Sequence, residues 1–511
     1  MNTFDAILQG FSVALTPANL GFTFVGCLLG TIVGVLPGLG PAAGIGLLLP
    51  ITFNMDPTSA LIMMAGMYYG AMYGGSTTSI LINTPGEAGS VMTALDGYQM
   101  ARKGRAGAAL AVAAIGSFIA GTIGIVALSV LAVPLAEVAI DFGPAEYFCL
   151  MLFAMAAVSS LAGKSVGKGL FVTMLGLAVS TVGIDLQSGL ARYTLGFPAL
   201  EEGIDFLVVV VGLFAIGEVL CGIEEFLRGD AEALRIKGRL WLTRDEWRRS
   251  RAPILRGSII GFFKGVLPGA GATISTILSY VVEKKLSKEP EKFGTGMIEG
   301  VAGPESANNA STCGVMVPLL ALGIPGSATT AVLLGAFIMY GIQPGPLLFD
   351  TRPDLVWGLI DSMYIGNLML LVLNLPLVGL FVRILYVPKT ILLPTVLAIC
   401  LIGVYTINNS TFDVWMALGF GVLGYVFRKV DIPLAPMVLG VVLGGSMEQS
   451  FRRALTISDG SPAIFVSSGI SITLLIAAGI MLCLPLLGAL SRRLRQPRYA
   501  ASLTTSKETL Q

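Results

Sequence analysis

The sequence of 511 residues contains no histidine and few charged residues, and both absences restrict its function. Without histidine, imidazole catalysis, histidine-ligated metals and histidine proton relays are excluded. Charged residues make up 12% of the chain and hydrophobic residues 54%, whereas an ordinary soluble protein has about 25% charged residues. So few charges could not cover the surface of a soluble protein. We therefore expect most of the chain to face lipid or other membrane helices.

An excess of one charge sign is also lacking, because 32 basic residues oppose 31 acidic ones. With no basic field to hold phosphates, nucleic acid is excluded as a partner. The six cysteines are scattered singly in apolar stretches, so we expect buried, inert thiols and neither a disulfide framework nor a zinc site. The first 20 residues lack the basic segment and cleavage site of a signal peptide, so we expect the hydrophobic segments to direct insertion.

Long apolar runs are abundant, and several approach the ~20 residues that a spanning helix needs. The clear runs are 107–135, 147–161, 169–184, 204–223, 356–385, 391–407, 412–427, 434–445 and 463–490. Three further runs, 20–50, 58–85 and 257–282, are apolar but interrupted. The pattern predicts an all-α polytopic membrane protein with about 10–12 transmembrane segments.

Lysine and arginine predict which segments face the cytoplasm. The strongest basic cluster lies between Arg228 and Arg256, and 102–105, 164–168, 428–429 and the tail after residue 491 carry smaller ones. Residues 141–146, 183–203 and 408–410 then fall outside. Arg452 and Arg453 are exceptions, because the alternation of spans places them outside as well.

The chain contains an internal duplication. VLPGLGP at 35–41 recurs as VLPGAGA at 266–272, offset by 231 residues, and NTPG at 83–86 is echoed by GIPG at 323–326, offset by 240. Pro144 corresponds to Pro394 at an offset of 250, so the order is kept while the offset grows slowly. The run 107–135 starts inside and its counterpart 356–385 ends inside. Opposite orientation is the inverted-repeat pattern of secondary transporters.

The interrupted run 257–282 is predicted to be a re-entrant hairpin. Arg256 precedes this run and four lysines follow it, so both of its ends are predicted to face the cytoplasm. The sequence Leu267-Pro268-Gly269 lies midway and is expected to interrupt the helix. A single kinked spanning helix is the alternative, and it would leave the lysines outside. The run 20–50 should be the matching hairpin with its tip at 37–41. It is also long enough to cross once as a broken helix, so the side of the N-terminus stays open.

Each hairpin is followed by a stretch of uncharged polar residues that we predict to be a second break. These stretches are 74–79 with 83–86, and 304–312 with 324–327. They are also consistent with helix packing or an extramembrane loop, but their repetition beside the LPG motifs favours a binding cavity. A half-helix N-terminus can hold a carboxylate, whereas free carbonyls with Ser, Thr and Asn oxygens suit Na⁺. Lys264 could bind the anion or extend to the inside face.

We predict no catalytic residue, and a substrate and ion site at residues of both halves. The first half contributes Gly38, Gly40, Ser76, Thr77, Thr78, Asn83 and Thr84, and the second Gly269, Gly271, Thr273, Asn308, Asn309, Ser311 and Thr312. Na⁺ is a candidate ligand of the same motifs, and no other cofactor is expected. The candidate acids for proton handling are Glu87, Glu137, Glu218, Glu305, Asp361 and Glu448, and Glu305 is the first to test because it lies beside 308–312.

Enzyme motifs fail. The sequence GKS at 163–165 lacks the glycine that a P-loop needs at position 158, and GxSxG and HExxH are absent. We therefore expect no enzymatic activity. A channel or exporter of small organic anions and a membrane scaffold without a cavity remain as alternatives to a transporter.

The motif residues resemble a known family. GVLPGLGP at 34–41, YGAMYGGSTTSILINTPG at 69–86 and GVLPGAGA at 265–272 resemble the large membrane subunit of the tripartite tricarboxylate transporters, the TctA family. The resemblance covers nearly the whole chain. It implies a multi-pass protein of the bacterial inner membrane, with a small four-helix membrane subunit and a periplasmic solute-binding protein as partners.

The resemblance further implies import of citrate or a related carboxylate by symport, driven by a Na⁺ or H⁺ gradient. The arrangement is similar to elevator-type carboxylate transporters, in which paired hairpins move with the substrate. We divide the chain into an N-terminal interfacial segment (1–19), a first transmembrane repeat (20–223), a cytoplasmic connecting loop (224–256), a second repeat (257–462), a C-terminal transmembrane helix (463–490) and a cytoplasmic tail (491–511).

Overall fold

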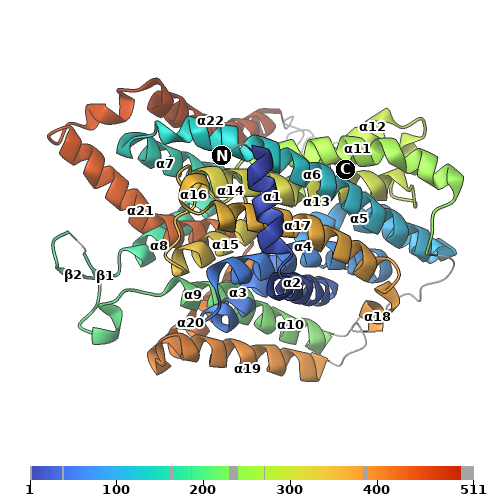
Figure 1. The fold of residues 1–511 in the computed structure, drawn as a ribbon, viewed down its shortest axis with the longest axis horizontal. Helices are drawn as coiled ribbons and strands as arrows, with labels where there is room; N and C mark the ends of the chain where they lie inside the picture. The colour runs from blue at the N-terminus through green and yellow to red at the C-terminus, as the bar shows by residue number, and fades with distance from the viewer. Residues whose placement is uncertain are drawn as a thin grey trace, which may run out of the picture.

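The described part of the chain is almost entirely helical (Figure 1). The computed structural model describes residues 3–36, 39–161, 165–185, 187–228, 240–269, 271–383 and 389–495. Within these ranges the sole sheet is an antiparallel hairpin of β1 (Gly183–Ile184) and β2 (Ala191–Arg192), which projects from the helical body in Figure 1. The prediction of an all-α protein is confirmed.

The helices fall into two series on either side of residues 229–239. The first series is α1 (Thr3–Ala14), α2 (Pro17–Val35), α3 (Pro41–Thr52), α4 (Pro57–Ile82), η1 (Ala88–Ser90), α5 (Val91–Met100), η2 (Ala101–Arg105), α6 (Ala106–Ile140), α7 (Pro144–Leu161), α8 (Val166–Ser180), η3 (Pro198–Leu200), α9 (Phe206–Val210), η4 (Val211–Ile216) and α10 (Gly217–Arg228). The second is α11 (Arg244–Val266), α12 (Gly271–Leu286), η5 (Pro290–Lys292), α13 (Glu299–Gly314), α14 (Met316–Leu322), α15 (Ala328–Met339), α16 (Leu348–Thr351), α17 (Pro353–Asn374), α18 (Val378–Val382), α19 (Lys389–Asn408), α20 (Thr411–Lys429), α21 (Ala435–Ile457), η7 (Pro462–Val466) and α22 (Gly469–Arg495).

Several helices are long and apolar enough to cross a membrane. Among the described residues five qualify: Pro17–Val35, Ala88–Ile140, Pro144–Leu161, Phe206–Glu224 and Pro353–Asn374. Shorter apolar helices of 10–17 residues are Pro41–Thr52, Val166–Ser180, Ala328–Met339, Thr390–Thr406 and Gly469–Cys483. The chain is thus a multi-pass membrane protein, while the total of about 10–12 segments stays a prediction.

Glycines let pairs of helices pack with their backbones in contact, and the same arrangement occurs in both halves. A Cβ atom built on Gly30 of α2 would lie 2.4 Å from the Met67 carbonyl oxygen of α4. One built on Gly261 of α11 would lie 2.3 Å from the Ala307 carbonyl oxygen of α13. Only glycine permits this approach, as in small-residue interfaces of membrane helices. These glycine-bearing helix faces are therefore packing faces.

The helix breaks also match between the halves. After α2 the chain continues through Leu36 (φ −86°, ψ 112°), and after α11 through Leu267 (φ −81°, ψ 120°), so both LPG motifs end a helix in the same extended conformation. Farther along, Asn83 (φ 56°) ends α4 and Gly323 (φ 68°) ends α14, both in the left-handed region. The duplicated sequence thus has duplicated local structure. The opposite membrane orientation of the two halves stays a prediction.

The second LPG break joins a helical hairpin. Arg256, before the break, binds Glu283 of α12 with its Nη2 2.5 Å from Oε2. A Cβ built on Gly44 of α3 would lie 3.1 Å from Cγ1 of Val33 in α2, so the chain also turns back at the first break. At both breaks the helices on either side therefore contact each other. Entry and exit of each hairpin on one side of the membrane remain a prediction.

Three of the segments that the sequence predicts to be inside lie together. Arg105 pairs with Glu246, Lys103 donates to the Thr295 carbonyl at 2.5 Å, and Arg249 binds Glu299 at 2.7 Å. These contacts bring the loop at 102–105, the start of α11 and the residues after α12 to one face.

The exceptional Arg452 lies with the segments that the sequence places outside. Its guanidinium binds Asp185 at 3.1 Å and Glu448 at 2.6 Å, and Glu448 also binds Arg192 at 2.7 Å. A basic residue on the outer side is thus explained by neutralisation within a network of two arginines and two acids.

Three predictions need correction. The polar clusters at 74–79 and 304–312 are helical, in α4 and α13, and the backbone leaves the helix only after each cluster. Their hydroxyls bond to carbonyls one turn back, as Thr312 does to Asn308 at 3.2 Å, so they need no break to find partners. Residues 244–256, predicted as loop, form the first part of α11. Of the six thiols, Cys483 is exposed, so not all are buried.

Candidate functional site

A fully buried polar cluster lies where α13 of the second half meets α4, α5 and α6 of the first. The α13 residues Glu305, Asn308 and Asn309 have no exposed surface, and Ser76 of α4 is 3% exposed. Buried groups of this kind are costly unless they are hydrogen-bonded. Their partners therefore show what the cluster can bind.

Glu305 joins three helices. Its Oε2 accepts from Ser76 Oγ of α4 at 2.5 Å, and its Oε1 accepts from Thr93 Oγ1 of α5. One turn on, Asn309 donates from Nδ2 to Ser117 Oγ of α6 at 2.6 Å, while its Oδ1 has no partner among the described residues. One face of α13 thus carries the Glu305 acid and the Asn309 amide, whose Oδ1 can still accept a hydrogen bond.

Asn308 faces a second acid, which belongs to the first half. Its Nδ2 donates to Glu87 Oε1 at 2.9 Å, and its Oδ1 has no partner among the described residues. Glu87 precedes η1, where its side chain accepts from the Gly89 N–H at 2.5 Å in a capping box with Ser90. The loop at 87–90 is therefore a fixed turn held against α13.

The start of α12 closes this region. A Cβ on Gly89 would lie 2.4 Å from Asn308 Oδ1 and 2.9 Å from the Ala272 Cβ, so the three residues are in contact. The 16-residue helix α12 begins at Gly271, one residue before this contact. Its N-terminus has free N–H groups and the positive end of the helix dipole. An N-terminus beside an amide is a geometry that can hold a carboxylate.

Tyrosines of α4 form the wall behind the cluster. Tyr73 donates from its hydroxyl to Asn367 Oδ1 of α17 at 2.7 Å, and Tyr69 lies 2.5 Å from the Cys313 sulfur of α13. Each tyrosine is at most 3% exposed. These contacts fix the α4 face that also carries Ser76, so the polar cluster has a rigid support.

The described residues of the region show neither a metal centre nor an ion pair to its buried acids. Within the described ranges no three Asp, Glu or Cys side chains come together, and no ion pair involves Glu87 or Glu305. Helix-end N–H groups and neutral amides are then the available ligands for an anion. The arrangement favours reversible binding, in which no bond has to break.

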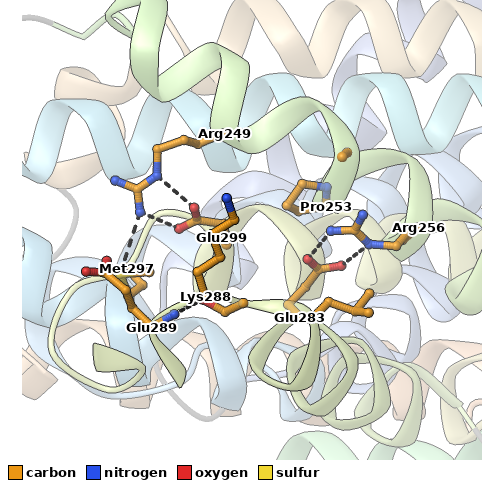
Figure 2. A pocket seen from close by; sticks show the side chains of 11 residues that line it. Arg249, Pro253, Arg256, Glu283, Lys288, Glu289, Met297 and Glu299 are labelled. Carbon is orange, nitrogen blue, oxygen red and sulfur yellow. Dashed lines mark hydrogen bonds and ion pairs between the residues drawn. The ribbon is translucent and has the colours of Figure 1, made fainter. Parts of the chain in front are cut away.

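Two cavities flank the α11–α13 region. A small one of about 10 Å³ touches Tyr73, Ser76, Thr77, Ser117 and Asn374, which is room for about one water molecule. A larger pocket of about 460 Å³ opens on the predicted inner face (Figure 2). It is lined by Arg249, Arg256, Glu283, Lys288 and Glu299, and the dashed lines of Figure 2 mark the Arg249–Glu299 and Arg256–Glu283 pairs.

The structure joins some of the predicted site residues and separates others. The residues buried in α4 and α13 are Ser76, Thr77, Thr78, Asn308, Asn309, Ser311 and Thr312. The residues at the starts of α3 and α12 and in the second break are Gly40, Gly271, Thr273 and Gly269. Asn83 is exposed at the end of α4 and Thr84 follows it, so these two lie apart from the cluster. Gly38 lies outside the described residues.

Sequence reasoning missed several members of the cluster. Thr93 and Ser117 are single hydroxyls with no motif around them, and only the fold places them against α13. Glu87 was not missed, because the sequence analysis names it among the candidate acids, and the structure adds that its side chain caps η1. Glu305 was singled out beforehand as an acid, and its burial makes it central.

Comparison with known proteins gives the chain its relatives. Residues 20–439 match the family described as the tripartite tricarboxylate transporter TctA family. A protein of Agrobacterium vitis, described as an uncharacterized 52.8 kDa protein in the TAR-I ttuC′ 3′ region, is 48% identical over 475 residues, covering 93% of this chain and 94% of its own. A second protein from the same organism, described as an uncharacterized protein in the TAR-II ttuC′ 3′ region, is 50% identical over 215 residues, which cover 42% of this chain and 89% of that protein. No solved structure matches the chain.

Proposed function

The chain belongs to the tripartite tricarboxylate transporter TctA family, and from this we propose that it is the large permease subunit of a secondary transporter. It imports a tricarboxylate or related carboxylate across the bacterial inner membrane, using a Na⁺ or H⁺ gradient. A periplasmic binding protein delivers the substrate, and a small four-helix membrane subunit completes the complex. No enzymatic step takes part in transport.

One observation carries the proposal. The second LPG break starts α12 with its N-terminus beside Asn308 and the 87–89 turn, next to a buried polar cluster without a cationic side chain among the described residues. In our proposal one carboxylate of the substrate binds the free N–H groups of α12 and the Asn308 amide. Dipoles thereby balance the negative charge of the substrate. Because no fully charged side chain holds the substrate, the substrate can leave on the other side of the membrane.

Transport requires the site to open. The cavity of about 10 Å³ beside Ser76 has room for about one water molecule and not for a carboxylate. In our proposal the protein is therefore a gated transporter and not an open channel. We propose that the α11–α12 hairpin moves relative to the first half, as in an inverted repeat of elevator type, and that the pocket between Arg249 and Glu283 is its inner exit.

Counterflow is the experiment that tests the function. Vesicles that contain all three subunits are loaded with unlabelled citrate, and uptake of radiolabelled citrate and other carboxylates is measured with and without Na⁺. Exchange that depends on the large subunit is expected. Absence of exchange for every carboxylate tested would reject the function. Uptake that is unchanged after all ion gradients collapse would instead favour a channel or exporter.

A pair of amide variants tests the site. Asn309→Ala leaves Ser117 without its buried donor, and we expect at least a tenfold loss of exchange, equivalent to about 1.4 kcal/mol. Asn408→Ala, at an exposed helix end, is the matched control and should exchange as the wild type does. Full exchange by Asn309→Ala in correctly inserted protein would remove Asn309 from the site.

A further inference from the structure

The carboxyl group of Glu305 is a fully buried acid whose partners, among the described residues, are hydroxyl groups. Its residue has 0% exposure, with Ser76 Oγ 2.5 Å from Oε2 and Thr93 Oγ1 in contact with Oε1. Ionising a carboxyl in such surroundings is expensive, because the interior has a low dielectric constant and no cation compensates the charge. The neutral, protonated acid avoids this cost.

The neighbouring helices do not supply the missing positive charge. The titratable and charged groups on the packed elements include Tyr73 on α4, Glu87 before η1, Asp96 on α5, Glu283 on α12, and Arg256 and Lys264 on α11. Arg256 is bound by Glu283, Lys264 forms no ion pair with Glu305 among the described residues, and the other groups in this set are acids or a phenol. On the other packed helices, α14 has no charged residue and α6 has a single acid, Glu137, near its far end.

The two buried acids differ in the kind of partner they have. Glu87 accepts from N–H donors, the Gly89 backbone and the Asn308 amide, and these cannot accept a proton in return. Such donors at the start of a helix suit an ionised carboxylate. Glu305 meets hydroxyls, which can both donate and accept. The hydrogen bonds therefore favour a charged Glu87 and a protonated Glu305.

A protonated Glu305 completes its hydrogen bonds without leaving a donor unused. Its Oε1 accepts from Thr93, its Oε2–H can donate to Ser76 Oγ, and Ser76 can then donate to the Met72 carbonyl 3.3 Å away. Ser76 also touches the small cavity with room for about one water. A proton thus has a hydroxyl relay from Glu305 to a water position.

We propose that Glu305 carries the coupling proton of transport. A proton taken from water on the outer side forms the O–H bond at Oε2, and breaking that bond returns the proton to water on the inner side after the site has moved. The inference rests on the proposed function and deepens it, because it names H⁺ and one residue for the coupling that the function requires.

The test compares gradient-driven accumulation with exchange in vesicles that contain all three subunits. Glu305→Gln keeps the shape of the protonated acid and cannot release a proton. We expect it to exchange radiolabelled citrate in counterflow within about threefold of wild type, but to lose the tenfold or greater accumulation that an inward pH gradient drives. Glu202→Gln makes the same chemical change at an exposed position between η3 and α9, outside both the cluster and the lining of the larger pocket, and should keep both.

The outcomes are separable. No counterflow by the wild type would reject the proposed function, and this inference with it. Accumulation driven by the pH gradient in Glu305→Gln would reject the inference alone. If Glu305→Gln loses both activities, infrared spectra of the purified complex decide. A carboxylic acid C=O band that shifts in D₂O should be present in wild type and Glu202→Gln and should be lost in Glu305→Gln. An unchanged band would overturn the proposal.

Discussion

The contact between α2 and α4 yields a sharp prediction about Gly30. Replacing Gly30 by alanine adds a Cβ 2.4 Å from the Met67 carbonyl oxygen and 2.9 Å from the Gly70 Cα. Both are backbone atoms, so no side-chain rotation relieves the overlap. Because carbon contacts are comfortable only near 3.5 Å, the helices would have to separate by about 1 Å.

The magnitude follows from two opposing effects. Overpacking of this kind costs about 1–3 kcal/mol, while replacing glycine by alanine within a helix favours the helix by about 0.5–1 kcal/mol. Gly30→Ala should therefore destabilise by about 1 kcal/mol, the middle of a range of about 0–2.5 kcal/mol. Gly21 lies on the same helix and has no neighbouring atom within 4 Å, so Gly21→Ala gains the helix preference without the overlap.

Unfolding in detergent, followed by fluorescence and by helix content, measures this difference. Gly21→Ala should unfold at or above the wild-type midpoint and Gly30→Ala below it. The duplicated packing adds a parallel case, because Gly261→Ala places its Cβ 2.3 Å from the Ala307 carbonyl and should cost a similar amount. Equal midpoints for Gly30→Ala and Gly21→Ala would refute the close contact on which both halves are built.

Three further predictions concern charged groups. Asp96 accepts hydrogen bonds from three backbone N–H groups of the loop before α13 and from the Tyr280 hydroxyl. Asp96→Asn should therefore destabilise by about 1–3 kcal/mol in the same unfolding assay. An unfolding midpoint equal to that of the wild type would contradict this. Arg256→Gln leaves the buried Glu283 unpaired and should destabilise by about 2 kcal/mol, which is less than for a fully buried pair because Arg256 is 39% exposed. The additional change Glu283→Gln should recover part of the lost stability. If it recovers none, the pairing is contradicted. In the segment predicted to lie outside, the Gln187 N–H, together with Ser188 and Arg452, lowers the pKa of Asp185 to about 2. The contribution of Asp185 to stability is therefore complete above the ordinary pKa near 3.8 and is lost as the pH falls towards 2. Pepsin should cleave the 183–203 segment faster over that range, and a rate that shows no such rise would exclude Asp185 as the group that holds this segment.

Much of the fold follows from local sequence rules. Proline followed by glycine in an apolar run ends a helix wherever it occurs, so both LPG breaks could be placed in advance. Glycines at intervals of four residues, such as Gly257, Gly261 and Gly265, lie on one face of a helix, and in the structure this face packs closely on α13. The exception is Gly269, which continues that spacing but lies in the break with φ at 80°.

The polar clusters show where sequence reasoning ends. Serine, threonine and asparagine in an apolar run read equally well as a break or as helix, because the deciding bonds run to carbonyls one turn back or to other helices. Ser76 makes both kinds, to Met72 and to Glu305. The partners across the cluster are up to 229 residues apart, so no local pattern could identify Thr93 or Ser117.

The most direct measurement is the position of the bound substrate in a cryo-electron microscopy map of the three-subunit complex with citrate. Our account predicts a carboxylate between the N-terminus of α12 and Asn308, within hydrogen-bond distance of helix N–H groups. Density for citrate elsewhere alone, for example held by Arg249 and Arg256 in the inner pocket, with the start of α12 still closed against Gly89, would contradict it.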